Sequence, residues 1–410
     1  MRKIILGCFL LLAAEHVQAQ KGVNSLYSAF GIGDLEEKDY SRSFGMGSAG
    51  IARPSGSFLN ELNPASYGRI PMETFLFEVS LAAKTLQYNT STESQPAGDV
   101  NFKRVAMGFK PHKLWGVGIG LMPYSRVDYK LLNTKFIEGT NTGIRNAIEG
   151  SGGINRLYLS NALQISKNFS VGVSTAFLFG PVTTTDSLGS SGSDEDIYSE
   201  QRRSYRSFNL TTGLQYSGRI GEWQLGLGAT YRFKSTLSTD DDFSIHSKDA
   251  TVLYEEKRSA SNYVLPEQIG AGLSLTNGAI TWVADYRQQN WKGMNPNLQD
   301  YKYVNSRRYA AGVEYSFYKY YFDSRVEGLS LQAGFNYHTG YMQIKGQQIN
   351  DLGFSLGGSL PSKTGHLRYY LGVEAGQRGT ALQGLVKENY VNFVLHLSMR
   401  DNWFFKRREY

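Results

Sequence analysis

The sequence predicts an all-β protein, a transmembrane antiparallel β-barrel of about 14 strands. In residues 329–338 every second residue is apolar, and the residues between them are polar or small. Because side chains alternate across a strand, one face of this segment would meet lipid and the other a polar lumen. The pattern recurs in 223–234 and 391–400. These segments run about 10 residues with aromatic residues near their ends, which favours membrane-spanning strands over the shorter strands of a soluble sandwich.

The N-terminus predicts export. Arg2 and Lys3 precede an apolar run over residues 4–14, and small residues before Gln20 supply a cleavage site, so residues 1–19 are expected to be a signal peptide. The only cysteine, Cys8, lies within it. The mature chain would therefore have no disulfide and no cysteine metal site. We expect the outer membrane of a Gram-negative bacterium.

Composition excludes several other classes of protein. Beyond the signal peptide no stretch approaches the roughly 18 consecutive apolar residues of a transmembrane helix. The chain has 45 glycines, 27 tyrosines and 22 phenylalanines but only 10 prolines, which suits a large sheet with aromatic girdles. The formal charge of +7 is scattered over strands and turns. We interpret it as lumen lining and rim, and expect no nucleic-acid partner.

The alternation begins near Thr74 and continues to the C-terminus. We expect strands at 74–88, 101–110, 115–130, 154–167, 169–181, 205–219, 222–238, 251–276, 279–290, 306–318, 328–343, 349–361, 366–378 and 388–402. Connections after even strands are mostly tight, with the longer 319–326 as an exception. Those after odd strands are predicted to be long polar loops at 131–153, 182–204, 239–250 and 291–305. An even strand count predicts both termini at the periplasmic side, and 251–262 is expected to extend above the membrane.

Motifs along the chain resemble one family of membrane barrels. Residues 45–52 are Gly-Met-Gly-Ser-Ala-Gly-Ile-Ala, and 62–65 are Leu-Asn-Pro-Ala, just before the first strand. Together they resemble the N-terminal plug, or hatch, of the FadL family of outer-membrane transport proteins, of the FadL and TodX type. Further segments resemble later strands of that family: Leu265-Pro266-Glu267 before Gly270, the set Trp282, Asp285 and Trp291, residues 309–315, and residues 329–337. The resemblance covers nearly the whole mature chain.

The resemblance implies a division of the mature chain into a plug at 20–72 and a monomeric barrel at 73–410. Residues 21–72 are also too few to build a core of their own. Hydrophobic molecules would bind inside the barrel and leave sideways through a gap. Candidate plug and gating residues are Gly45, Gly47, Gly50, Asn63, Pro64 and Ala65. Candidate ligand-lining residues are Phe44, Met46, Ile51, Phe58 and Leu62. Candidate lateral-gap residues are Gly116, Gly118, Gly120 and Pro123.

Simpler interpretations of these motifs stay open. The strand glycines would also relieve crowding against a plug, and Asn63 to Ala65 would also suit an ordinary turn, since proline fixes its own backbone and asparagine satisfies nearby backbone groups. Residues 45–50 fit G-x-G-x-x-G, but no parallel strand precedes them, so a compact plug backbone is preferred to nucleotide binding. Two acidic runs, 194–196 and 240–242, lack the spacing of a calcium loop.

Three functions are compatible with this pattern. The preferred one is a passive, plug-gated outer-membrane channel for small hydrophobic or amphipathic compounds, with lateral exit into the membrane. The alternative is a PorV-like barrel that docks or shuttles protein partners of a secretion system. An enzyme comes third, because the six histidines give no assignable Ser-His-Asp set. His338 and His396 are expected in the lumen without metal-ligand partners. Expected contacts are outer-membrane lipid, lipopolysaccharide and hydrophobic small molecules, with no cofactor and no metal.

Overall fold

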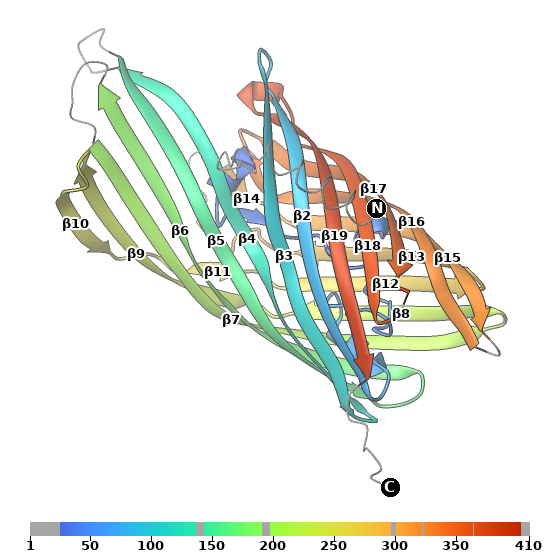
Figure 1. Cartoon of the computed structure of the whole chain (residues 1–410). Coiled ribbons are helices and arrows are strands. Elements are labelled where there is room, and N and C mark those ends of the chain that lie inside the picture. The colour runs from blue at the N-terminus through green and yellow to red at the C-terminus, as the bar shows by residue number, and fades with distance from the viewer. Residues whose placement is uncertain are drawn as a thin grey trace.

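The computed structural model describes residues 25–136, 143–190, 197–296, 301–321, 324–363 and 365–402. They form a closed antiparallel β-barrel with a 14-stranded wall, as predicted (Figure 1). The wall strands are β2 (Thr74–Asn89), β3 (Ser94–His112), β4 (Trp115–Phe136), β5 (Gly143–Gln164), β6 (Phe169–Ser190), β7 (Ile197–Ile220), β8 (Trp223–Arg232), β12 (Gln268–Asn277), β13 (Ile280–Gln289), β15 (Ser306–Tyr321), β16 (Ser324–Ile344), β17 (Gln347–Pro361), β18 (Leu367–Arg378) and β19 (Lys387–Asn402). The expected signal peptide lies outside the described residues.

Shorter elements complete the chain. Five further strands lie inside or above the wall: β1 (Asp34–Leu35), β9 (Ser235–Ser247), β10 (Val252–Arg258), β11 (Tyr263–Leu265) and β14 (Tyr301–Tyr303). The 3-10 helices are η1 (Leu26–Ala29), η2 (Phe44–Met46), η3 (Pro64–Arg69) and η4 (Leu382–Gly384). Within the described ranges, every helix is too short to cross a bilayer.

Closure of the barrel comes from β19 and β2. These strands pair from Lys387 opposite Asn89 to Asn402 opposite Thr74 without a register shift. Every other wall strand pairs with its neighbour along the chain. We call the end where β2 begins and β19 ends the base, and the opposite end the top.

The predicted register of the wall is confirmed. On β16, Leu331 and Phe335 point outward and are exposed, whereas Ser330 and Asn336 are buried on the lumen side. On β19, Phe393 is 49% exposed. Alternation therefore assigns the faces correctly, because each second residue of a strand shares a face.

Four wall strands and their neighbours rise well above the rest of the barrel. The outward apolar band reaches Leu121, Leu157, Phe179 and Phe208. Beyond it lies a sheet that we call the crest: residues 124–136 of β4, 143–153 of β5, 181–190 of β6, 197–204 of β7, β9 and β10, on the left of Figure 1. The prediction of long polar loops at 131–153, 182–204 and 239–250 is therefore wrong over 131–136, 143–153, 182–190, 197–204 and 239–247, which are strand. Their polar side chains suit a sheet that faces water. The backbone hydrogen bonds between its strands form as readily as those between apolar strands.

Three smaller expectations also change. Strands β15 and β16 extend to Tyr321 and from Ser324, so the predicted connection at 319–326 is mostly strand. The eighth predicted segment, 251–276, is divided into β10, β11 and β12, and β10 extends above the band as expected. The loop at 291–305 contains β14, which pairs with β16.

Residues 25–73, which we call the inner segment, run through the lumen. Helix η3 packs against β4 to β7 near the base, and η2 packs against β15 to β18 (Figure 1). Ser25 lies at the top, where its hydroxyl contacts Glu388 of β19 and its N–H points to the Asp128 carbonyl of β4. The first described residue thus lies at the end opposite to the one where β19 ends, whereas the prediction placed both termini at the same, periplasmic end. An even number of wall strands places the start of β2 and the end of β19 at the same end of the barrel. The inner segment, however, crosses the lumen before β2 begins.

One junction in the wall is incomplete. Strands β3 and β4 pair from Val105 opposite Leu121 to Phe109 opposite Val117, and again at His112 opposite Trp115. Toward the top the two strands diverge, and no further pairs join them within the described residues. We call this unpaired upper part of the junction the seam.

Candidate functional site

Buried ion pairs join the inner segment to the wall. The Arg42 guanidinium bonds both carboxylate oxygens of Glu314 on β15, and Arg53 Nη2 lies 2.9 Å from Glu314 Oε1. Nearer the top, Lys38 Nζ lies 2.9 Å from Glu374 Oε2 on β18. Glu314 and Glu374 are almost fully buried. Breaking such a pair leaves an uncompensated buried charge, so these contacts hold the inner segment firmly.

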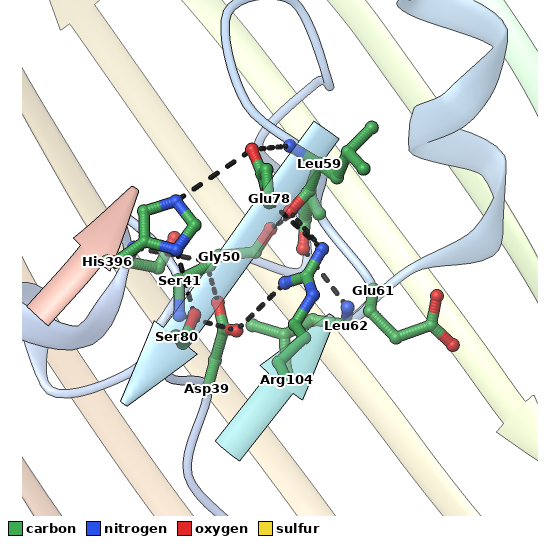
Figure 2. Close-up of polar contacts among 12 residues, drawn as sticks. Asp39, Ser41, Gly50, Leu59, Glu61, Leu62, Glu78, Ser80, Arg104 and His396 are labelled. Carbon is green, nitrogen blue, oxygen red and sulfur yellow. Dashed lines mark hydrogen bonds and ion pairs between the residues drawn. The ribbon is translucent and has the colours of Figure 1, made fainter. Parts of the chain in front are cut away.

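A second polar cluster lies where β2, β3 and β19 face the inner segment (Figure 2). Arg104 of β3 is 1% exposed, and its Nη2 lies 3.2 Å from Glu78 Oε2 and 3.0 Å from the Leu59 carbonyl oxygen. Its Nη1 lies 3.7 Å from a carboxylate oxygen of Asp39. The Leu59 N–H donates to Glu78. The cluster thus links wall strands to two separate parts of the inner segment.

The same cluster contains a serine, a histidine and a glutamate, which the sequence could not place together. His396 Nδ1 lies 2.8 Å from Ser80 Oγ, and His396 Nε2 lies 3.8 Å from Glu78 Oε1 (Figure 2). A nucleophile needs access to its substrate, and all three side chains are at most 1% exposed. None of them lines a described cavity. The group is a packing contact rather than a catalytic site.

The glycine motif at 45–50 places the inner-segment backbone directly on the wall. Gly47 has φ +67°, and a Cβ there would lie 2.2 Å from the Phe335 carbonyl oxygen, so only glycine fits. The Gly45 N–H donates to the Tyr370 hydroxyl. The Gly50 and Ile51 N–H groups donate to Asp285 Oδ2 at 2.6 and 2.9 Å. The motif is a close-packed attachment to the wall.

Asn63, Pro64 and Ala65 form the start of η3 at the base. The Asn63 side-chain oxygen accepts from the Ala65 N–H, and its amide donates to the Ile51 and Leu214 carbonyls. Pro64 occupies the first helical turn, where no N–H donor is needed. Asn63 therefore ties the helix cap, the glycine motif and the wall strand β7 together.

The candidate ligand-lining residues do not surround an open space. Phe44, Met46 and Ile51 are at most 1% exposed, and Phe58 is 4% exposed. A Cβ on Gly312 would lie 2.4 Å from the Met46 Cβ. Two of the five candidates line described cavities: Leu62 in the upper lumen, and Phe58 near the base in a cavity of about 250 Å³.

The two cavities between the inner segment and the wall in the upper lumen are small and charged. One of about 70 Å³ is lined by Asp34, Glu36, Lys38, Lys103 and Arg378, among others. Another, of about 100 Å³, is lined by charged side chains including Glu37, Arg232 and Arg287. Burial raises the pKa of the Glu37 carboxyl, but the Arg287 guanidinium and further arginines hold that pKa at about 2. An apolar ligand would have to replace the solvation of these charges, which costs free energy.

Of the four candidate lateral-gap residues, only Pro123 lies at the seam. Gly116, Gly118 and Gly120 lie nearer the base, where β3 and β4 are joined, and Gly118 and Gly120 pair with Gly108 and Ala106. Gly118 and Gly120 face the rings of Tyr67 and Tyr158 at contact distance, so the strand glycines relieve crowding. Pairing between β3 and β4 stops at Leu121, two residues before Pro123. A groove of about 570 Å³ opens there, lined by residues of β3 to β6 including Phe102, Pro123 and Val127.

The inner segment covers the seam from the lumen side. Strand β1 pairs with β4, with Asp34 opposite Arg126 and Leu35 opposite Ser125. The Glu36 N–H donates to the Tyr124 carbonyl. Across the seam, the Arg126 guanidinium donates to the Asn101 side chain of β3. The chain thus supplies its own strand where the wall strand β3 turns away.

The remaining expectations fall on packed side chains. His338 lies in the lumen, with its Nε2 2.8 Å from the Ser306 hydroxyl. Asp241 accepts bonds from the Gln201 side chain in the crest. The acidic run at 194–196 lies outside the described residues.

The fold and its filled lumen define a FadL-type β-barrel. More specifically, the chain belongs to the BamG family, since the family model described as BamG matches residues 1–409. No curated protein matches the sequence at a significant level. The suspected FadL resemblance therefore holds for the fold, and the family itself is BamG.

Solved structures of this fold are hydrocarbon channels and their relatives. A Pseudomonas aeruginosa FadL homologue is 13% identical, with a TM-score of 0.63 over 90% of this chain and 100% of that one. The P. putida toluene transporter TodX is 16% identical, with a TM-score of 0.62 over 91% and 100%. The CymD monoaromatic hydrocarbon channel is 15% identical, with a TM-score of 0.58 over 88% and 97%. None of these three is described as an enzyme, and at such identities the likeness concerns the fold.

Proposed function

We propose that this protein is a docking barrel of the bacterial outer membrane, which holds a protein partner on its crest and keeps its lumen closed. The observation that carries this proposal is the charged, packed lumen. Arg42, Arg53 and Lys38 join the inner segment to buried wall carboxylates, and the upper cavities are small and charged. A hydrophobic compound would have to disrupt these pairs in order to pass.

The crest supports the same proposal. It rises above the apolar band on one side of the barrel, and its described residues form a paired sheet. Leu132, near the top of β4, is 75% exposed. A rigid, exposed surface loses little conformational entropy when a partner binds, which favours docking.

A tether between the inner segment and the wall tests the proposal. A Cβ added to Gly68 would lie 3.6 Å from the Cβ of Ala162 on β5, within the range of a disulfide. We would place Gly68→Cys/Ala162→Cys protein in vesicles with a lipopolysaccharide outer leaflet, which toluene crosses poorly, and measure toluene entry with and without reductant. The two single-cysteine variants are the controls. A docking barrel gives no toluene entry above protein-free vesicles in either state.

A photo-crosslinking residue at Leu132 tests the partner directly. In intact cells we expect a discrete protein adduct from this crest position and only lipid adducts from Phe393. Toluene entry that the oxidised tether abolishes would overturn the proposal and favour transport.

The second candidate function is a passive channel for small hydrophobic compounds with lateral exit, and the seam is the observation that favours it. The groove of about 570 Å³ opens beside Pro123 and next to the exposed, apolar Phe102. Pro123→Val supplies a backbone donor and a strand-favouring side chain. Uptake of a panel of hydrophobic compounds would be compared in cells with wild-type protein, the variant or no protein. Lateral exit predicts loss of uptake in the variant, and equal uptake in all three contradicts transport.

A further inference from the structure

Strand β10 has a free edge at the side of the crest. It pairs with β9 from Val252 opposite His246 to Arg258 opposite Asp241. Among the described residues, no strand pairs with its other edge. Such an edge presents a row of backbone donors and acceptors that another extended chain can use.

The side chains of β10 are exposed along its whole length. Val252, Leu253 and Tyr254 are 53%, 58% and 48% exposed, and the four charged residues that follow are exposed as well. Three consecutive exposed apolar residues are unusual on a free edge, because native proteins usually protect edges with charges or proline. The strand belongs to the crest, beyond the exposed apolar side chains of the band.

The charges along β10 are not balanced equally. On the β9 side, Lys257 lies opposite Asp242 and Arg258 lies opposite Asp241. Glu255 and Glu256 lie opposite Ser244 and Phe243, which carry no charge. Arg258 bonds Glu256 along the strand, with Nε 3.1 Å from Oε2. Glu255 forms no ion pair with a described residue, so an acidic position lies directly beside the apolar half of the edge.

We propose that the free edge of β10 receives an extended segment of a partner protein by antiparallel strand addition. Main-chain hydrogen bonds would hold the segment, and its side chains would give specificity. Antiparallel pairing places basic residues of the segment opposite Glu255 and Glu256, followed toward its C-terminus by apolar residues opposite Tyr254, Leu253 and Val252. The partner is thus recognised by two basic residues followed by an apolar run.

A second copy of this chain is a poorer occupant. Two antiparallel strands of one sheet are related by a twofold axis perpendicular to the sheet. The β10 sheet continues the barrel wall, so this axis would lie near the plane of the membrane. The second barrel would then be inverted, which two copies in one membrane cannot achieve.

Labelled peptides test the proposal with the full-length protein in lipid nanodiscs. The probe peptide carries two lysines followed by three valines between threonines, and the matched control carries two glutamates in place of the lysines. Fluorescence anisotropy should show saturable binding of the lysine peptide and at least about tenfold weaker binding of the control, since each tenfold step is about 1.4 kcal/mol. The double variant Glu255→Lys/Glu256→Lys should reverse that preference.

A third peptide separates strand addition from simple charge attraction. N-methylation of alternate amides of the lysine peptide removes the donors that would face β10, and binding should then be lost. Binding that survives N-methylation, or no binding at about 1 mM, would overturn the proposal. Dimers of the protein that Leu253→Pro dissolves would overturn it as well, in favour of a second copy.

This inference rests on the proposed docking function, but the two fail separately. If the peptides do not bind while Leu132 still gives a protein adduct, strand addition at β10 is contradicted and the proposed docking function stands. If toluene enters and the oxidised tether blocks that entry, the docking function itself is contradicted.

Discussion

The wall is joined differently at β19–β2 and at β3–β4. Strands β19 and β2 pair without interruption over their full length, whereas β3 and β4 pair only near the base. Beside the complete junction, the inner segment is attached through side chains, such as the Leu59 N–H on Glu78. At the seam it is attached through its backbone, by β1 and by the Glu36 N–H. The inner segment thus braces a finished wall in one region and replaces a missing wall strand in the other.

The largest expected effect comes from the complete junction. Glu78→Leu leaves Arg104 buried without its carboxylate partner on β2, which should cost about 3–5 kcal/mol of unfolding free energy. Reversible urea unfolding in detergent micelles measures it. Glu78→Leu/Arg104→Met should recover much of the loss, because an apolar pair leaves no unpaired charge. A single variant as stable as wild type would contradict the bracing role of this cluster.

The next effect concerns the lipid-facing side of β19. Phe393→Arg places a charge in the middle of the apolar band, which should cost about 2–4 kcal/mol. Leu132→Arg is the matched control, since Leu132 is more exposed but belongs to the crest above the band. It should change stability by less than about 1 kcal/mol. Equal losses in a folding assay with lipid vesicles would show that the crest also contacts lipid.

A smaller, local effect is expected at the seam. Gly33 has φ +92°, and a Cβ there would lie 2.4 Å from the Arg126 carbonyl oxygen. Gly33→Ala should therefore weaken the attachment of β1 by about 1–3 kcal/mol. Hydrogen exchange at residues 124–128 should accelerate by about tenfold or more, with the unfolding midpoint nearly unchanged.

The control for this prediction is another glycine with positive φ. Gly278 has φ +58°, and a Cβ added there would meet no atom within 4 Å, so Gly278→Ala should cost about 1 kcal/mol without affecting the seam. Unchanged exchange at residues 124–128 in Gly33→Ala would show that β1 does not hold the seam closed.

The smallest effect is expected between β7 and β9, at the lower edge of the crest. Arg206 and Asp240 form an ion pair at 2.9 Å, but both side chains are more than half exposed. Water and salt screen such pairs, so Arg206→Gln should change the unfolding free energy by less than about 0.5 kcal/mol. A loss close to that of Glu78→Leu would mean that the crest, and not the lumen, stabilises the barrel.

The sequence by itself determined the barrel, its strand number and the faces of its strands. Alternation is a local property, and Phe393 and Asn392 point to opposite sides wherever a strand forms. The same local reasoning located the break beside Pro123 and the attachment of Asn63 to a turn. It failed for the crest, because polar residues at 131–153 and 182–204 look like loops when no membrane boundary is known.

Only the tertiary structure decided what fills the lumen. Glu78, Arg104 and His396 come from three strands, and the pairs of Arg42 and Arg53 with Glu314 join residues more than 250 positions apart. A single sequence carries no signal for such partners, since each charge looks like an ordinary lumen residue. The inner segment reaches the top and pairs with β4 because the closed wall leaves the upper edge of β4 free at the seam. That edge exists only after the barrel has formed.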